Sequence, residues 1–346
     1  MLFSKNLIRW YIENKRDLPW RRTNDPYKVW LSEIMLQQTR VAQGMPYYLK
    51  FINAFPTVFD LARASEEEVL KLWQGLGYYS RARNLQKAAK YVAEELDGNF
   101  PNTYKGLLSL KGVGDYTASA VASICFKEPV AVVDGNVFRV LSRVFGIATP
   151  INSTEGKKQF GELAQKLIDK KNPSDHNQAL MEFGALQCTP QKPDCLSCPF
   201  SSGCIAFNQN RIAELPVKLK KQKIKKRHFN YLVFLSDDGE TLVQQRRGKG
   251  IWEGLYEFPL VETTAEIGQA DLVEEEAYRE YAQQSSEEVV LFNETPVVHK
   301  LSHQHIHTKF WIVNCENLPS EGVSVKELNK YPVPVLIENF IDTFDF

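Results

Sequence analysis

The strongest chemical signal in the sequence is a cluster of four cysteines. Cys188, Cys195, Cys198 and Cys204 are separated by six, two and five residues, so all four fall within seventeen positions. The prolines and glycine between them keep the segment out of regular structure, and it can wrap around a centre that supplies the order a small loop lacks. Four thiolates at this spacing indicate either a zinc ion or an iron–sulfur cluster, and both stay open on the residues alone. Disulfides are the weaker interpretation in a chain expected to be cytosolic.

Two carboxylates occupy contrasting settings. Asp134 opens a helical pattern that continues through Val144, and a helix N-terminus favours the charged form of such a group. Glu33 lies on a helix that starts with Asp25 and Pro26 and is rich in large apolar residues, which favours its neutral form. This combination is the one that glycoside-type chemistry uses for proton donation and cation stabilisation. A capping aspartate and a surface glutamate are the structural alternatives.

A glycine-rich turn lies twenty residues before Asp134. Gly112 and Gly114 flank one apolar residue between two helical segments. Glycines let consecutive backbone N–H groups point outward, and a helix expected to begin at Thr117 adds its dipole, so the turn could bind a phosphate. An ordinary helix–helix turn is equally compatible with these residues alone.

The charge of the chain is unevenly divided although its net value is zero. Residues 1–227 carry 34 basic and 21 acidic side chains, whereas residues 228–346 carry 8 and 21. A basic segment suits a polyanion such as nucleic acid, with a solvated charged surface as the alternative. The sign changes at a lysine-rich stretch, residues 218–228, which we interpret as a linker.

The two sides of this linker differ in their apolar spacing. Residues 1–217 show helical periodicity, and residues 229–346 show short β-rich runs at 231–235, 241–244 and 309–313 with a polar helical stretch at 271–284. We therefore expect a helical domain followed by an α+β domain. The longest apolar runs are strand-sized, so no membrane span is expected. Cys125 and Cys315 stand apart from the cluster and are expected to be small buried hydrophobes.

Six segments together resemble the helix-hairpin-helix DNA glycosylases that carry a [4Fe–4S] cluster, and within them the adenine DNA glycosylases of the MutY type. The resemblance covers nearly the whole chain. The matching segments are residues 18–21 (LPWR), 30–39 (WLSEIMLQQT), 75–85 (GLGYYSRARNL), the Gly112 hairpin, 133–137 (VDGNV) and the cysteine loop. It implies an all-α glycosylase domain with an iron–sulfur loop at residues 1–217, a basic linker at 218–228 and a MutT/Nudix-like α+β domain at 229–346. It also implies a [4Fe–4S] cluster on Cys188, Cys195, Cys198 and Cys204.

The resemblance implies a catalytic role for four residues. Glu33 would protonate adenine at N7, and Asp134 would stabilise the oxocarbenium-like sugar and position the attacking water, assisted by Asn136. Tyr116 matches an active-site tyrosine or serine of the family. In the related bifunctional enzymes of the endonuclease III type, a Schiff-base lysine holds the place of Tyr116, and a phenol cannot form that imine. We therefore expect base release without strand cleavage.

Further positions match family residues that contact DNA. Arg21 and Gln178 match contacts to the flipped adenine. The positions that would enter the duplex at the lesion are Gln38, Thr39, Leu76 and Tyr78, while Gly112 and Gly114 would hold the phosphate backbone.

The second domain resembles the MutT-like domain that inspects 8-oxoguanine. Residues 250–259 (GIWEGLYEFP) are its best match, and Ser302 and His303 match the reading residues, although Leu301 stands where the family usually has Phe. A working Nudix hydrolase needs an arginine at position 282, where this chain has Ala, so pyrophosphate hydrolysis is not expected.

The resemblance implies double-stranded DNA with A:8-oxoguanine or A:G mismatches as the partner. We expect a cytoplasmic monomer of bacterial type that associates with the nucleoid when on DNA. Two other functions remain as alternatives: a bifunctional glycosylase/lyase and a non-catalytic damage-binding protein.

Overall fold

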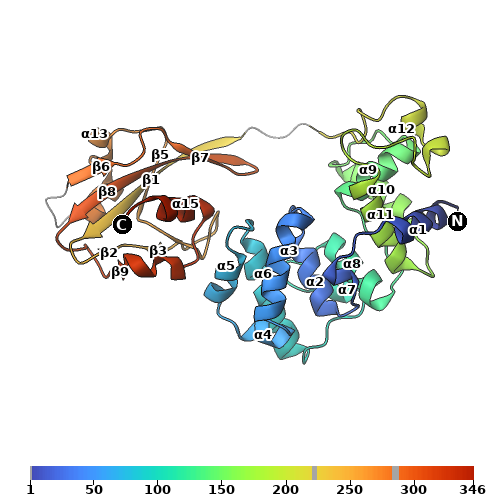
Figure 1. Ribbon diagram of the computed structural model, residues 1–346, viewed down its shortest axis with the longest axis horizontal. Helices are drawn as coiled ribbons and strands as arrows, with labels where there is room; N and C mark the ends of the chain where they lie inside the picture. The colour runs from blue at the N-terminus through green and yellow to red at the C-terminus, as the bar shows by residue number, and fades with distance from the viewer. Residues whose placement is uncertain (1, 220–223, 283–287) are drawn as a thin grey trace. The chain divides into compact units, whose positions relative to one another are not determined.

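A computed structural model describes residues 2–219, 224–282 and 288–346 of the chain. The chain divides into two compact units, Met1–Arg63 with Asn84–Lys220, and Ala64–Arg83 with Lys221–Phe346 (Figure 1). Residues 220–223 of the expected linker lie outside the described residues. Within the described part of the chain, no helix is long and apolar enough to cross a membrane.

The first unit is helical, as the apolar periodicity predicts. Its helices are α1 (Leu2–Asn14), η1 (Pro19–Arg21), α2 (Pro26–Met35), α3 (Val41–Ala54), α4 (Val58–Arg63), α6 (Ser80–Glu95), α7 (Tyr104–Leu107), α8 (Asp115–Phe126), α9 (Gly135–Phe145), α10 (Thr154–Leu167), α11 (Pro173–Leu186), η2 (Ser201–Gly203) and α12 (Ile205–Asn208). The first residues of α6 belong to the second unit.

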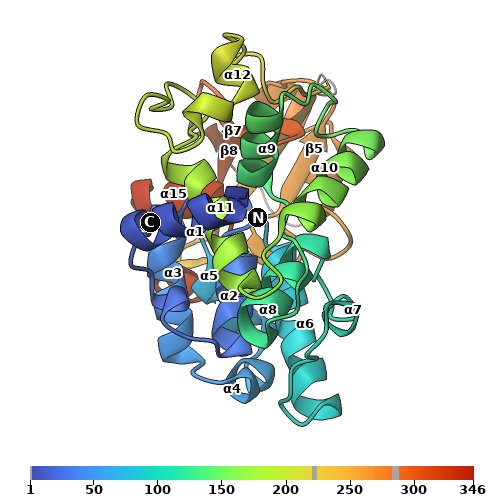
Figure 2. The same cartoon turned by 90° about the vertical axis from the view of Figure 1, so that its right-hand side faces the viewer.

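Helix α11 is central to the arrangement of the first unit. It packs against α1, α8 and α9 (Figure 2). The core between α1, α9 and α11 includes Trp10, Val140 and Phe183, which are all buried. The half-buried Cys188 and Cys198 pack against the same core, so the cysteine loop is continuous with it.

The second unit is built on a five-stranded sheet in the order β5 (Leu260–Thr263), β1 (Lys225–Ser236), β8 (Gln304–Cys315) and β6 (Glu288–Leu291), with β7 (Val297–Lys300) also paired to β8. Strands β1 and β8 are parallel, and the other pairings are antiparallel. Two small sheets pair β2 (Glu240–Thr241) with β9 (Val323–Ser324), and β3 (Gln244–Gln245) with β4 (Tyr256–Glu257). The remaining helices are α5 (Glu66–Trp73), α13 (Gln269–Leu272), α14 (Glu276–Ala282), η3 (Val325–Lys330) and α15 (Val335–Thr343).

The large sheet is covered on both faces. Successive side chains of a strand point to opposite faces, and the central strands β1 and β8 bury runs of consecutive residues. Phe310 of β8 stacks on Phe340 of α15 with ring centroids 4.1 Å apart. The neighbouring Trp311 belongs to a core cluster with Leu272 of α13 and Tyr278 of α14. The α+β class expected for this part of the chain is thus confirmed.

Some expected element bounds are wrong. The run at 241–244 is split between β2 and β3. The polar helix expected at 271–284 is two short helices, α13 and α14, and residues 283 and 284 lie outside the described residues. Helix α8 begins at Asp115 rather than Thr117, because Gly114 already has the extended conformation of an N-cap.

Candidate active site

Glu33 lies on the buried face of α2. Asp25 caps this helix by accepting a hydrogen bond from the Tyr27 backbone N–H, and Pro26 occupies its first position. Glu33 is 6% exposed, and its Oε2 accepts a 2.6 Å hydrogen bond from the Tyr116 hydroxyl. Burial raises the pKa of Glu33 to about 7, with the Asp134 charge acting in the same direction and the Tyr116 hydrogen bond against it. The sequence expectation of a carboxyl group that favours its neutral form agrees with this geometry.

Asp134 is the N-cap of α9, as the sequence predicts. Its Oδ1 accepts from the backbone N–H groups of Asn136 at 3.0 Å and Val137 at 2.8 Å, and its Oδ2 accepts from Asn136 Nδ2 at 2.8 Å. Burial nevertheless raises the pKa of Asp134 above its ordinary value, and these donors only oppose the rise. The helix-end donors thus favour the charged form as the sequence indicates, and desolvation of the buried carboxylate is the opposing effect that the sequence does not show.

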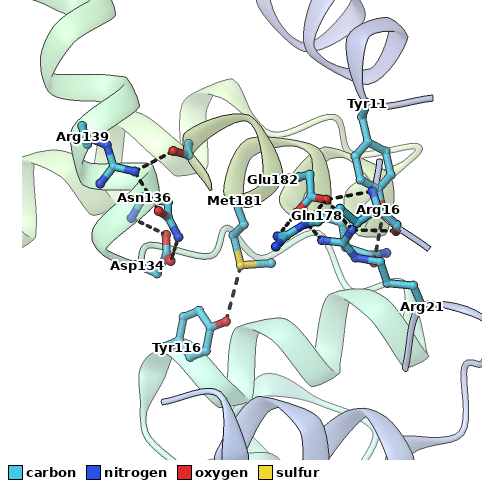
Figure 3. A network of polar contacts seen from close by, with 11 residues as sticks. Tyr11, Arg16, Arg21, Tyr116, Asp134, Asn136, Arg139, Gln178, Met181 and Glu182 are labelled. Atoms are coloured by element: carbon cyan, nitrogen blue, oxygen red, sulfur yellow. Dashed lines mark hydrogen bonds and ion pairs between the residues drawn. The ribbon is translucent and has the colours of Figure 1, made fainter. Parts of the chain in front are cut away.

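Tyr116 lies in the first turn of α8 and faces the carboxylates. Its hydroxyl is 2.6 Å from Glu33 Oε2. The same hydroxyl is 3.5 Å from Met181 Sδ (Figure 3). Burial and the charges of Glu33 and Asp134 raise its pKa well above the ordinary value. Tyr116 therefore stays protonated and acts as a hydrogen-bond donor to Glu33.

Asn136 is held from its other side by Arg139 (Figure 3). The Arg139 guanidinium donates to Asn136 Oδ1 at 2.8 Å, to the Gly184 carbonyl at 2.6 Å and to the Cys188 carbonyl at 2.7 Å. A Cβ at Gly184 would lie 2.6 Å from Asn136 Cβ and 2.9 Å from its backbone oxygen. The start of α9 and the end of α11 thus approach more closely than any larger residue at 184 permits.

The Arg21 guanidinium is bound by the carboxylate of Glu182. Glu182 was not predicted from the sequence. Arg21 donates to both carboxylate oxygens of Glu182 at 2.8 and 2.7 Å, and Arg16 does the same at 2.8 and 2.6 Å. Glu182 is 1% exposed. The sequence signal that could have found it is its place on α11, one turn after Gln178.

Gln178 lies beside this ion pair. Its Oε1 accepts from the Tyr11 hydroxyl at 3.3 Å, and its Nε2 donates to Ser174 Oγ at 3.1 Å. The Arg21 guanidinium lies over the Tyr11 ring, 5.7 Å from the centroid. The structure thus brings Glu33, Tyr116 and Asp134 together and places Gln178 and Arg21 on adjoining elements.

The predicted hairpin glycines meet different requirements. Gly112 has a left-handed backbone with a φ of 79°, and a Cβ there would lie 2.7 Å from Asn84 Cβ. Gly114 has nothing within 4 Å of a built Cβ. The turn therefore needs glycine at 112 for its conformation, while at 114 the absence of a side chain leaves the backbone open.

The four residues expected to enter a duplex differ in exposure. Gln38 is exposed and has a left-handed φ of 57°, and Thr39 is half-buried. Tyr78 is 45% exposed, with a φ of 51°. Leu76 is only 4% exposed. In this conformation Leu76 packs inside the protein, so it would have to leave that packing to enter a duplex.

The four cysteines of the loop line one cavity, together with apolar side chains that include Val144 and Phe183. None of them forms a disulfide. The buried Arg143 donates to Cys188 Sγ at 3.5 Å and to the carbonyls of Thr189 and Pro190 at 2.7 and 3.0 Å. The other two cysteines behave as small apolar side chains, with Cys315 buried and Cys125 half-buried.

Ser302 and His303 are exposed and lie in the turn between β7 and β8. They line a cavity of about 540 Å³ in the second unit, together with Leu301 and Tyr78. The Tyr78 and Ser302 hydroxyls are 2.6 Å apart. The structure therefore brings together three of the predicted DNA-contacting residues at one cavity.

Comparisons with known proteins agree with this organisation. Residues 31–170 match the HhH-GPD superfamily of base excision DNA repair proteins, and residues 230–343 match the NUDIX domain. A thermostable thymine-DNA glycosylase of known structure superimposes with a TM-score of 0.56 at 32% identity, covering 60% of this chain and 96% of that one. A trapped endonuclease III–DNA intermediate gives 0.52 at 23% identity, which shows the shared fold. The class of protein is thus an HhH-GPD base excision repair protein with a C-terminal Nudix-type domain.

Relatives within this class are more specific. The chain is 34% identical over 319 residues to the adenine DNA glycosylase of Buchnera aphidicola subsp. Baizongia pistaciae, a match that covers 90% of this chain and 86% of the relative. It is 50% identical over 226 residues to the adenine DNA glycosylase of Rattus norvegicus and 41% identical over 309 residues to that of Arabidopsis thaliana. These matches span 44% and 49% of the two longer relatives. The chain belongs to the adenine DNA glycosylase family.

Proposed function

We propose that this protein releases adenine from a mismatched DNA duplex by hydrolysing its N-glycosidic bond and leaves the abasic strand intact. The observation that carries the proposal is the buried carboxyl group of Glu33, whose pKa is raised to about 7. It lies near the carboxylate of Asp134, which caps the N-terminus of α9. A group with a pKa like that of Glu33 can hold a proton near neutral pH and still give it to a base.

The proposed reaction starts with a base flipped out of the stack, because a glycosidic bond inside a duplex is inaccessible. Glu33 gives its proton to adenine N7, which makes the base a better leaving group. Positive charge then develops on the sugar, and the Asp134 carboxylate stabilises it. Asn136 holds Oδ2 of Asp134 through its amide, so the carboxylate is oriented before the charge appears.

Tyr116 favours a monofunctional enzyme over the first alternative, a glycosylase/lyase. A lyase of this class needs an amine that forms an imine with the sugar, and the half-buried phenol of Tyr116 hydrogen-bonds Glu33 instead. Borohydride trapping on cut DNA tests this alternative directly. The second alternative is a damage-binding protein without activity. It does not explain why the pKa of Glu33 is raised next to the helix-capping carboxylate of Asp134.

We propose a [4Fe–4S] cluster on Cys188, Cys195, Cys198 and Cys204. The residues fit such a group, because the four side chains line one cavity and N–H donors from Arg143 and the Phe200 backbone approach Cys188 and Cys198. Four thiolates can hold either zinc or an iron–sulfur cluster, and the membership of the chain in the adenine DNA glycosylase family favours the cluster. The cluster would supply the order of the loop.

We propose that the second unit inspects the base opposite the adenine and favours 8-oxoguanine. The cavity lined by Tyr78, Leu301, Ser302 and His303 supports this role. Polar groups there are exposed, so they can reach a base edge, and an aromatic ring next to them can replace lost stacking. Leu301 provides an aliphatic contact where the family usually has an aromatic one.

The proposed partner is double-stranded DNA that contains A:8-oxoguanine or A:G mismatches, with the basic first part of the chain facing the phosphates. We propose that the protein acts as a monomer in the cytoplasm, bound to the nucleoid when on DNA.

One assay tests the proposed function. Protein in excess is incubated with duplexes that contain A opposite 8-oxoguanine, G or C, and adenine release is followed in a single turnover. We expect release from the first two duplexes and little from the third. Binding to the mismatches without any release would overturn the proposal in favour of a damage-binding protein.

A further inference from the structure

Arg21 is the cation that acts on Glu33, and both of its terminal nitrogens are engaged. Both NH1 and NH2 donate to Glu182, and NH1 also donates to the Arg16 carbonyl at 3.1 Å (Figure 3). Two parallel bonds between a guanidinium and a carboxylate fix the orientation of the guanidinium as well as its position. Arg21 is therefore held in one place on η1.

Glu182 can hold Arg21 because it is ionised and surrounded by donors. Burial raises its pKa, but hydrogen bonds from Arg16 and Arg21 outweigh this and lower it to about 2. Arg16 also donates its backbone N–H to Glu182 Oε1 at 2.9 Å. A buried carboxylate with two guanidinium partners stays charged across the working pH range.

Arg21 also acts on Glu33. Its charge lowers the pKa of Glu33, and the Glu33 charge in turn acts on Arg21. The other groups that face Glu33 are the Tyr116 hydroxyl from α8 and the Asp134 carboxylate before α9. Arg21 is the cation among them. If it were free to turn, its attraction to the ionised form of Glu33 would draw the proton off the proposed acid.

We propose that Glu182 is a positioning residue that fixes and neutralises Arg21, and thereby prevents Arg21 from forming an ion pair with Glu33. This inference rests on the proposed function, since it assigns Glu182 the task of keeping Glu33 protonated in the free enzyme. Glu182 does not touch the substrate in this scheme. Its effect passes through the guanidinium.

The test uses the full-length protein and the single-turnover rate of adenine release between pH 5 and pH 9. Glu182→Gln removes the charge and keeps the shape. We expect the alkaline limb of the pH–rate profile to move to lower pH by about one unit or more. At a pH well above the limb, the rate of the variant should then be about tenfold lower than that of the parent. The loss should disappear as the pH falls, and the dissociation constant for the mismatched duplex should stay within about twofold.

Three further variants make the test specific. Glu257→Gln is the matched control, because Glu257 is 3% exposed and bonded to Arg246 at 2.6 Å in the second unit, and it should leave the limb in place. Glu182→Asp keeps the charge and should keep the limb near that of the parent. Glu182→Gln combined with Arg21→Met removes the guanidinium that acts on Glu33 and leaves only the partly exposed Arg16 without its carboxylate partner, so the limb should return to the pH of the parent or above. It also avoids an uncompensated buried arginine if the single variant does not fold.

The outcomes separate this inference from the proposed function. A parent protein without adenine release overturns the proposed function. An active parent whose Glu182→Gln variant is slower by the same factor at every pH overturns the positioning role and leaves a structural one. A double variant whose limb still lies below that of the parent overturns the inference too, because Arg21 is then not the cause.

Discussion

The half-buried Tyr116 donates a 2.6 Å hydrogen bond from its hydroxyl to Oε2 of Glu33, which is 6% exposed. This contact engages Oε2 and fixes the orientation of the carboxyl group, so Oε1 is the oxygen left for the substrate in the proposed mechanism. In the proposed mechanism Glu33 is the proton donor, and Tyr116 holds its carboxyl group in position.

The first prediction concerns that proton. Glu33→Gln keeps the shape and the acceptor for Tyr116 but has no proton to give to adenine. We expect the single-turnover rate of adenine release to fall by about 10²–10⁴-fold, while the affinity for an A:8-oxoguanine duplex stays near that of the parent. Near-normal release by this variant would remove Glu33 from the mechanism.

The pH dependence of the parent follows from the two raised pKa values. Glu33 must be protonated to act, so activity should fall as the pH rises through about 7, where Glu33 loses its proton. Asp134 must be ionised, and burial raises its pKa above the ordinary value of 3.8. Activity should therefore also fall as the pH is lowered through the pKa of Asp134, at a pH above 3.8. The two carboxyl groups are coupled, so the limbs belong to the pair. A rate that stays level from pH 6 to pH 9 would contradict this assignment.

A stability prediction tests the close approach of α11 to α9. Gly184→Ala puts a Cβ 2.6 Å from Asn136 Cβ and 3.0 Å from its backbone carbonyl carbon, so the start of α9 must shift. We expect a loss of about 1–3 kcal/mol in the free energy of unfolding and a slower release of adenine, because Asp134 caps that helix. Unfolding by denaturant measures the first effect.

Gly161→Ala is the matched control for this change. Gly161 lies within α10 and has nothing within 4 Å of a built Cβ. Alanine should therefore raise stability by about 0.5–1 kcal/mol through helix propensity and leave activity unchanged. Equal effects of the two substitutions would show that the contact with Asn136 is not tight.

The roles of residues that are set by local structure could be predicted from the sequence. Asp134 and Asp25 cap helices in the structure as their positions before helical patterns indicated, and Glu33 is buried because its helix is apolar on nearly all sides. These features depend on neighbours within one or two turns. Helix and strand classes were predictable for the same reason.

The contacts that the sequence could not show join residues far apart in the chain. Glu182 is bound by Arg16 and Arg21, more than 160 positions away, and no spacing rule connects them. The burial of Leu76 and the raised pKa of Asp134 likewise depend on tertiary packing around each residue. The family resemblance supplied the identity of Gln178 but not its partners.

The cysteine loop gives the fourth prediction. Cys198→Ser removes one thiolate, and we expect the purified protein to lose iron, lose its brown colour and bind DNA more weakly, because the proposed cluster would supply the order of the loop. Cys125→Ser is the control, since Cys125 lies on α8 outside the loop and should keep full iron content. Parent protein purified without oxygen that contains no iron would count against the cluster itself.

The last prediction tests whether the second unit reads the base opposite the adenine. Ser302 and His303 are exposed at the cavity next to Tyr78, and each good contact to a base edge is worth about 1–3 kcal/mol of discrimination. Changing both to Ala should lower the preference for A:8-oxoguanine over A:G by about tenfold or more, measured as the ratio of single-turnover rates at subsaturating protein. Release itself should continue, because Glu33 and Asp134 belong to the other unit. His305→Ala, two positions along on β8, is the control and should keep the preference. If the double variant keeps it as well, the discrimination arises elsewhere and the proposed role of the turn between β7 and β8 is wrong.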